Sequence, residues 1–505
     1  MPQKATFNAL AVFYVAMGAI PLGFVFFQSV YINDGISFEI YKELLLLPKN
    51  IELFFKSVML SLSVVILSSF FGVIIAAVLR YVDIYFKKFF LFAFMVPLIL
   101  PPYIMALAFS KVFGEWIFSF YGVVFIESTI YLGIVLLATY ILLGNIDKRL
   151  YESASMFCGW FCVFRHISLP LVKPYIFFIS TLVFLLSFGN YSVVNFLGYK
   201  SFVMQSFIEF SAFYNYRVAY ALSFVVLVIV FVAFYMKKLY AKKEKFEMEF
   251  NIDEKISYTN RPRYAFAIFG AFVMLVFFLV VLPIYTLIVD SKGFGSYIQA
   301  FMLIKESMFR SVLYALVGGF LVVFFGFATA YKKTVSKRYN DLLDISLLVF
   351  FALSGSILGM GFLVFFNTSW GELLYMSPLL LIFGYIVKYT LISHKIIYAN
   401  ILQIKNSYLE SAKILGAGYF DRIRYIILPL LKGSFLYSFI VVFIFLLRDT
   451  DITMMLYRAG SDTMSIKIFT LMANTPSEIV SALCVMMVFI SVLLLMVLAF
   501  MGRFV

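Results

Sequence analysis

Long uninterrupted runs of apolar residues restrict what this sequence can fold into more than any other feature. Twelve runs follow one another, at approximately 7–30, 54–79, 89–113, 124–144, 174–198, 219–236, 265–289, 309–331, 344–366, 377–397, 433–450 and 479–502. A helix of roughly 20 residues crosses the hydrocarbon core of a bilayer. Open β-structure cannot cross lipid, because its backbone polar groups would lack partners. The sequence therefore predicts an all-α polytopic membrane protein with about twelve transmembrane helices in the lipid bilayer.

Charged and metal-binding residues are too scarce for most other classes of protein. Charged residues make up 13% of the 505 residues, whereas soluble globular domains contain roughly 25%. Two histidines and three cysteines (Cys158, Cys162 and Cys484) are too few and too scattered for a metal cluster or a disulfide framework. We therefore expect no metal site and no bound cofactor, and we interpret Cys158 and Cys162 as free thiols.

Basic residues are distributed unevenly between the two sides of the predicted membrane. With the N-terminus inside, the cytoplasmic segments carry 27 Lys and Arg against 12 Asp and Glu, and the outer segments carry 12 against 14. An excess of basic residues marks the cytoplasmic side of a membrane protein. We therefore predict that both termini are cytoplasmic, and that the first run, which follows Lys4 and lacks a clear cleavage site, is retained. The net charge of +14 thus reflects topology and indicates no nucleic-acid partner.

The sequence repeats after about half of its length. The first copy has the tetrapeptide FKSV at 55–58 with Gly72 and Ala76, and the second has FRSV at 309–312 with Gly326 and Ala330. Six spans are an even number, so both copies enter the membrane from the same side. We predict two parallel six-helix repeats about an axis along the membrane normal. The first half is 1–236, the polar cytoplasmic linker is 237–264, and the second half is 265–505.

Two predicted cytoplasmic loops, at about 145–172 and 399–431, also repeat. The first contains Glu152, Ser153, Ala154, Gly159, Leu169 and Pro170, and the second contains Glu410, Ser411, Ala412, Gly416, Leu428 and Pro429. Each pattern predicts a short helix, a glycine turn, a second short helix and a proline that ends it before the next span. The small residues let another protein surface approach closely, and the glutamates offer charges for docking.

These loops resemble the Glu-Ala-Ala loops of permease subunits of binding-protein-dependent ABC importers, in which a Glu, a Gly six residues later and a Leu-Pro pair form the coupling helix. The second loop fits, because Gly416 follows Glu410 by six residues and Pro429 follows it by nineteen. In the first loop Cys158 occupies the glycine position and the distance to the proline is eighteen. The resemblance implies that both loops dock on an ABC ATPase dimer at the cytoplasmic face, the first less tightly.

Three further segments resemble the fused iron(III)-type permeases: 97–103, 385–389 and 456–463. This resemblance implies the permease subunit of an ATP-driven importer in the cell inner membrane. Its substrate, ferric iron, would arrive on a periplasmic binding protein. Arg448-Asp449-Thr450-Asp451 stands where these permeases have Glu-Leu-Pro. Thiamine, a phosphonate or another small solute therefore remains an alternative substrate.

The sequence has no phosphate-binding loop of the form G-x-x-x-x-G-K-S/T. We therefore predict that the chain is not an enzyme and that a separate ATPase uses the ATP and Mg²⁺. A twelve-span secondary transporter is the rival class, although it would need neither coupling loops nor an ATPase. A membrane-embedded enzyme or scaffold would need an intramembrane catalytic cluster, which we do not find in the sequence.

Ionisable residues end the eleventh run on its predicted outer side. Arg448, Asp449 and Asp451 form either a surface salt-bridge cluster at a helix end or part of a substrate pathway, where carboxylates would suit a hard cation. Asn190 and Tyr191 occupy the matching end of the fifth run, with the same two interpretations.

Other polar and helix-breaking residues lie within the runs. We interpret Lys388 as a side chain that snorkels toward the cytoplasm. Irregular helices beside the pathway are indicated by Pro97, Pro101 and Pro102 in the third run and by Gly355, Gly359 and Gly361 in the ninth.

Overall fold

The computed structural model describes residues 2–32, 35–243, 265–336, 339–368, 371–458 and 460–501. These residues are almost entirely helical, apart from a short antiparallel hairpin of β1 (Tyr31–Ile32) and β2 (Gly35–Ile36). Nine of the described helices could cross a membrane, or up to twelve if each of three bent pairs forms one span. Every predicted run lies on one of these helices or pairs. The predicted fold class is therefore confirmed.

The first half contains α1 (Pro2–Val30), α2 (Glu39–Leu46), α3 (Pro48–Tyr81), α4 (Lys87–Ala93), α5 (Val96–Ile99), α6 (Pro102–Phe113), η1 (Gly114–Phe118), α7 (Phe120–Gly144), α8 (Lys148–Ser155), α9 (Trp160–Val163), η2 (Phe164–Ser168), α10 (Leu169–Phe188), α11 (Ser192–Phe196), α12 (Phe202–Ser211) and α13 (Tyr216–Lys243). Helix α13 thus includes the first residues of the predicted linker, and 244–264 lie outside the described residues.

The second half contains α14 (Ala265–Val276), η3 (Phe277–Val281), α15 (Leu282–Asp290), α16 (Phe294–Val335), α17 (Asn340–Ala352), α18 (Gly355–Phe366), α19 (Glu372–Tyr375), α20 (Leu379–Ile401), α21 (Asn406–Ile414), α22 (Tyr419–Arg422), η4 (Ile423–Ile427), α23 (Leu428–Leu430), α24 (Lys432–Arg448), α25 (Asp451–Leu456), α26 (Met464–Leu471) and α27 (Ser477–Met501). Its order of helices follows that of the first half.

The repeated serines make the same contact in both halves. The Ser57 hydroxyl accepts a hydrogen bond from the N–H of Phe202 at 2.9 Å, and the Ser311 hydroxyl accepts one from Met464 at 2.6 Å. Each bond joins the long helix of the repeat, α3 or α16, to the start of a later helix, α12 or α26. The sequence repeat is therefore a structural repeat.

The repeated glycines let two helices of each half approach closely. A Cβ added at Gly72 would lie 2.9 Å from the Cβ of Val135 on α7, and one added at Gly326 would overlap the side chain of Ser393 on α20. Close packing leaves no room for a side chain at these two positions. The pairs α3–α7 and α16–α20 form the centres of the two halves.

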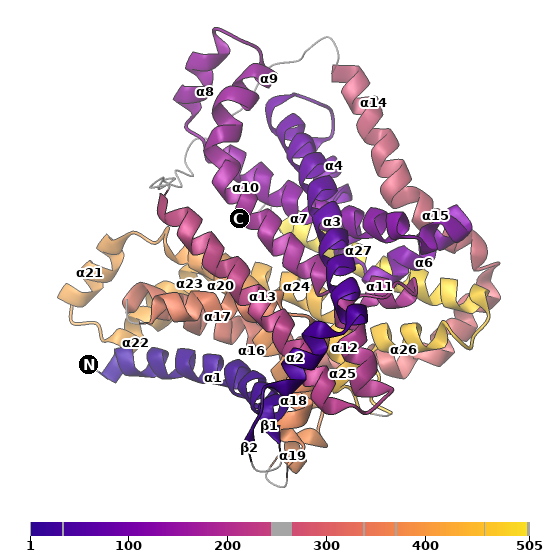
Figure 1. Cartoon of the computed structure of the whole chain (residues 1–505). Helices are drawn as coiled ribbons and strands as arrows, with labels where there is room; N and C mark the ends of the chain where they lie inside the picture. Colours follow the sequence, from indigo (N-terminus) through magenta and orange to yellow (C-terminus); the bar gives the residue numbers. More distant parts are fainter. Residues whose placement is uncertain are drawn as a thin grey trace.

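The first helix of each half packs against the other half. Helix α1 lies along α16 and α18, and the Tyr14 hydroxyl donates a hydrogen bond to the carbonyl of Val387 at 3.0 Å (Figure 1). In the opposite direction, α15 packs on α6, where Lys111 forms an ion pair with Asp290. Each half therefore contacts the other through its own first helix, which adds to the interface between the halves.

The third and ninth spans are both bent sharply near their middle. The axis turns by 100° between α4–α5 and the segment that begins with α6, and by 105° between α17 and α18. Leu100 and Leu353 are extended at these bends. Pro101 and Pro102 cause the first bend, since proline disfavours a helical residue before it. The predicted irregular helices are therefore confirmed.

Candidate functional site

The fifth and eleventh spans break at equivalent residues, Asn190 and Asp449. The Asn190 side-chain oxygen accepts a hydrogen bond from the N–H of Val193 at 3.2 Å, and Asp449 Oδ1 accepts one from Ile452 at 3.1 Å. Each bond supports the first turn of a short helix, α11 or α25, by satisfying a backbone donor that the helix leaves free. The same local fold is therefore present twice.

A tyrosine from a neighbouring helix contacts each of these two residues. Asn190 Nδ2 donates to the hydroxyl of Tyr131 on α7 at 3.2 Å, and the hydroxyl of Tyr389 on α20 donates to Asp449 Oδ2. The first pair joins neutral groups, whereas the second includes a carboxylate. The two halves thus share one arrangement, which we call the frame: Tyr131 and Asn190 in the first half, and Tyr389 and Asp449 in the second. The two copies of the frame differ in charge.

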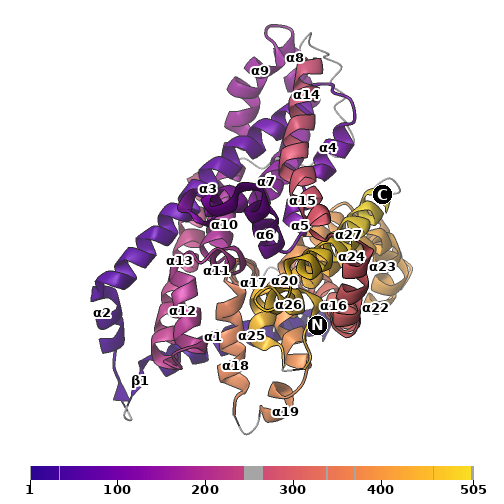
Figure 2. The same cartoon turned by 90° about the vertical axis from the view of Figure 1, so that its right-hand side faces the viewer.

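The two broken spans meet each other between the halves. The Ser192 hydroxyl, at the start of α11, donates to Asp451 Oδ1 at 2.6 Å and lies 2.5 Å from Thr450 Oγ1. Both α11 and α25 lie in the interior in the two views (Figures 1 and 2). Because Ser192 and Asp451 occupy equivalent positions, they meet at the axis that relates the halves.

A cavity of about 80 Å³ lies beside this meeting point. Its polar lining comprises Tyr131, Asn190, Ser192, Ser354, Lys388, Tyr389, Arg448, Asp449, Thr450 and Asp451. The Lys388 ammonium lies 3.5 Å from Asp449 Oδ2, and the Arg448 guanidinium lies over the ring of Phe445. A cavity with charged groups of both signs inside a membrane protein is a candidate substrate site.

Most of the predicted pathway residues lie together at this cavity. Asn190, Arg448, Asp449 and Asp451 line it, whereas Tyr191 is absent from its lining and packs against the ring of Phe207 at 4.4 Å. Asp449 is buried, so the interpretation of these residues as a surface salt-bridge cluster is wrong.

Two ionisable residues at the site were misread or missed in the sequence. The prediction that Lys388 snorkels toward the cytoplasm is wrong, because its ammonium pairs with the buried Asp449 at the cavity. Glu127 on α7 is buried near the cavity, and Ser187 donates a hydrogen bond to its Oε2. Glu127 is the one acidic residue within its apolar run, a signal that could have identified it.

The two predicted coupling loops each form a pair of short helices at an end of the molecule. Figure 1 shows α8 and α9 at the top and α21 and α22 at the left. Glu152 and Glu410 are exposed on the first helix of their pairs. The next turn exposes two large apolar side chains in each loop, at 83% for Met156, 91% for Phe157, 85% for Ile414 and 86% for Leu415. Exposed apolar patches of this kind mark interaction surfaces.

The turn between the short helices differs between the loops. Gly416 has φ +80°, a left-handed conformation that favours glycine, and the described backbone of the first loop contains no such residue. Gly159 and Gly418 each precede the second short helix, with φ −67° and −61°. Gly159 is therefore the structural equivalent of Gly418, whereas Cys158, which occupies the position of Gly416, does not adopt its left-handed conformation.

The proline of the first loop does not end its helix, contrary to the prediction, whereas in the second loop the helix ends at Leu430, directly after Pro429. Before Pro170 and Pro429 the backbone forms the π-helical turns η2 and η4, which continue into α10 and α23. Proline removes a backbone donor, and a π-turn accommodates the shifted hydrogen-bond pattern. The helix then bends by 67° before α24 in the second half.

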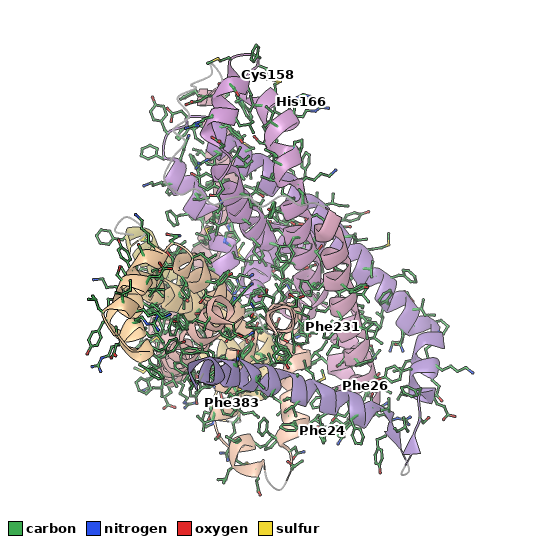
Figure 3. All side chains as sticks on the ribbon, turned by 90° about the vertical axis from the view of Figure 1, so that its left-hand side faces the viewer. Phe24, Phe26, Cys158, His166, Phe231 and Phe383 are labelled. Atoms are coloured by element: carbon green, nitrogen blue, oxygen red, sulfur yellow. A yellow bond between two sulfur atoms is a disulfide. The ribbon has the colours of Figure 1, made fainter. Side chains whose placement is uncertain are left out.

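The prediction of free thiols in the first loop is also wrong. Cys158 and Cys162 form a disulfide, with their Cα atoms 5.9 Å apart. The helix break at Gly159 allows this approach, which lies within the usual range for a disulfide. Figure 3 shows Cys158 and His166 at one tip of the molecule.

The paired halves, the broken central spans and the two protruding loops define a two-fold membrane transport protein. The chain belongs to the family described as "binding-protein-dependent transport system inner membrane component", whose model matches residues 68–246 and again 322–505. It is similar to the Fe(3+)-transport system permease protein FbpB 2 of Haemophilus influenzae, at 22% identity over 483 residues that cover 93% of each chain. The protein is thus the permease of a binding-protein-dependent importer, with both halves in one chain.

Proposed function

We propose that this permease imports ferric iron, delivered by a periplasmic binding protein, through the cavity between its halves. The observation that carries the substrate is the cavity's carboxylate chemistry, since oxygen ligands suit a hard cation. Of the two aspartates that line the cavity, Asp451 has fewer partners, because Asp449 also binds the backbone of α25. The relative named for Fe(3+) transport supports the same substrate.

Transport would be driven by an ABC ATPase dimer that docks on the coupling loops in the cytoplasm. Each loop offers one exposed glutamate and a pair of apolar side chains to one ATPase subunit. The loops continue into α10 and α24, which end at the cavity breaks. Movement of a docked loop would therefore reach Asn190 along one continuous helix in the first half, and Asp449 through a helix bent by 67° in the second. ATP and Mg²⁺ would be bound by the ATPase, and this chain would hold no cofactor.

Reconstitution of the chain with its ATPase and binding protein in proteoliposomes tests this function. We expect ATP-dependent uptake of radiolabelled ferric iron that competes with neither thiamine nor a phosphonate. Uptake of one of those solutes in place of iron would replace the substrate and keep the importer. Uptake driven by a proton gradient without ATPase would instead indicate a secondary transporter.

A further inference from the structure

The two halves build the same frame at the cavity, and of its equivalent positions only those of the second half carry charged residues, although the first half has the buried Glu127 nearby. Asn190 supports α11 as Asp449 supports α25, so this structural role does not require a negative charge. Ile130 is equivalent to Lys388, because it directly precedes Tyr131 as Lys388 directly precedes Tyr389. The charges at 388 and 449 therefore serve something other than the shared fold.

The Lys388 ammonium pairs with the Asp449 carboxylate and lies near the Asp451 side chain. It is 3.5 Å from Asp449 Oδ2, and a Cβ added at Gly355 would lie 2.7 Å from Lys388 Nζ and 2.7 Å from the Cβ of Asp451, so these two side chains meet beside Gly355. The residue is 8% exposed, so water contributes little to the stabilisation of its charge. A buried cation in a membrane protein needs such compensation by a counter-ion. Lys388 and Asp449 therefore compensate each other, with Asp451 close by.

Other polar groups at the cavity have no hydrogen-bond partner. Ser354 is 4% exposed and lines the cavity, yet its hydroxyl is unsatisfied, as is Nη1 of Arg448. Buried polar groups are normally satisfied, and a polar cavity of about 80 Å³ has room for several waters or a small hydrated ion. Water in this space would satisfy these groups, so the cavity is suited to a hydrated solute.

We propose that Lys388 is a built-in counter-cation that a multivalent cation displaces from Asp449 and Asp451. This inference rests on the proposed import of a cation. Without substrate, the ammonium pairs with Asp449 beside Asp451. When a hard cation enters, it takes Asp451 as an oxygen ligand and Lys388 withdraws. Return of the ammonium then favours release, because conduction requires binding that is weak enough to leave.

Terbium binding to the purified full chain tests this role directly. Tb³⁺ is a hard trivalent probe, and Tyr131 and Tyr389 at the cavity can sensitise its luminescence. We expect Lys388→Ile, which introduces the residue present at 130, to raise Tb³⁺ affinity at least tenfold. Addition of Asp451→Asn to this variant should abolish the gain.

Lys333→Met is the matched control. Lys333 forms an ion pair with Asp344, with Nζ 2.6 Å from Oδ2, and neither residue lines the cavity. This control should leave Tb³⁺ affinity unchanged. Unchanged or weaker binding by Lys388→Ile would overturn the inference. If that variant does not fold, amine-reactive labelling of Lys388 in the unmodified protein provides the test. Labelling should rise severalfold on addition of Tb³⁺, and constant labelling would overturn the inference.

The outcomes separate this inference from the proposed function. If Tb³⁺ behaves as expected but the reconstituted importer carries no iron, the counter-cation role stands and the substrate is wrong. If iron is imported but Lys388→Ile leaves Tb³⁺ affinity unchanged, the substrate stands and Lys388 has another role.

Discussion

The exposed apolar pair of the second coupling loop allows a quantitative test of ATPase docking. We predict that Leu415→Ser weakens binding of the ATPase subunit by about 10- to 100-fold. Leu415 is 86% exposed, so it loses almost all of its exposed area if the ATPase covers it. Burial of a leucine side chain contributes about 1.5–3 kcal/mol, and 1.4 kcal/mol corresponds to tenfold in Kd. Because an exposed side chain contributes little to the fold, stability should change by less than about 0.5 kcal/mol.

The measurement is a titration of nanodisc-embedded permease with the purified ATPase subunit. Phe157→Ser should weaken binding at the first loop in the same way, because Phe157 occupies the equivalent position and is also exposed. Phe213→Ser is the matched control, since Phe213 is exposed in the predicted periplasmic loop before α13. If Leu415→Ser and Phe157→Ser both bind the ATPase as the unmodified chain does, the loops are not its docking surface.

Three further predictions concern coupling, assembly and topology. Glu410→Arg should abolish ATP-driven uptake, because a charge reversal at a desolvated interface costs several kcal/mol, and Glu152→Arg should reduce uptake less; a larger loss from Glu152→Arg would reverse the ranking of the loops. Separate expression of the two halves, divided after residue 250, should preserve assembly in co-purification because each half holds the first helix of the other; halves that insert without associating would contradict this. In a cysteine-free background, an impermeant thiol reagent should label a cysteine at Ser461 in intact cells and one at Ser257 only after permeabilisation; the same pattern at both sites would refute the topology.

The spans and the repeat could be predicted because the bilayer fixes the length of an apolar run and duplication preserves spacing. The frame at the cavity could be predicted only in part. The sequence shows that Asp449 and Asp451 stand at the end of an apolar run, where carboxylates are candidates for a substrate pathway. Their contacts with Lys388 and Ser192 depend on packing between distant segments, which no local pattern encodes.

The coupling loops show the same division between local and distant information. Their two short helices followed from the spacing of glutamate, glycine and proline. The π-turn before Pro170 could not, because a proline within an apolar segment is compatible with a helix end, a kink or a π-turn. The choice among these three depends on the surrounding helix, which continues from α9 through α10 to α11.

Fusion of the two halves in one chain makes a one-sided charge arrangement possible. In a symmetric homodimer, a lysine at 388 would be repeated at the position of Ile130, and an arginine at 448 at the position of Gly189. Four cationic groups would then surround a cavity of about 80 Å³, where a low local dielectric strengthens their repulsion. Aspartates at both 190 and 449 could compensate them, but Ser192 would become an aspartate facing Asp451 at the axis, where Ser192 now donates a hydrogen bond. The fused chain avoids both conflicts, since one half can hold the neutral frame while the other carries the charges that act on the substrate.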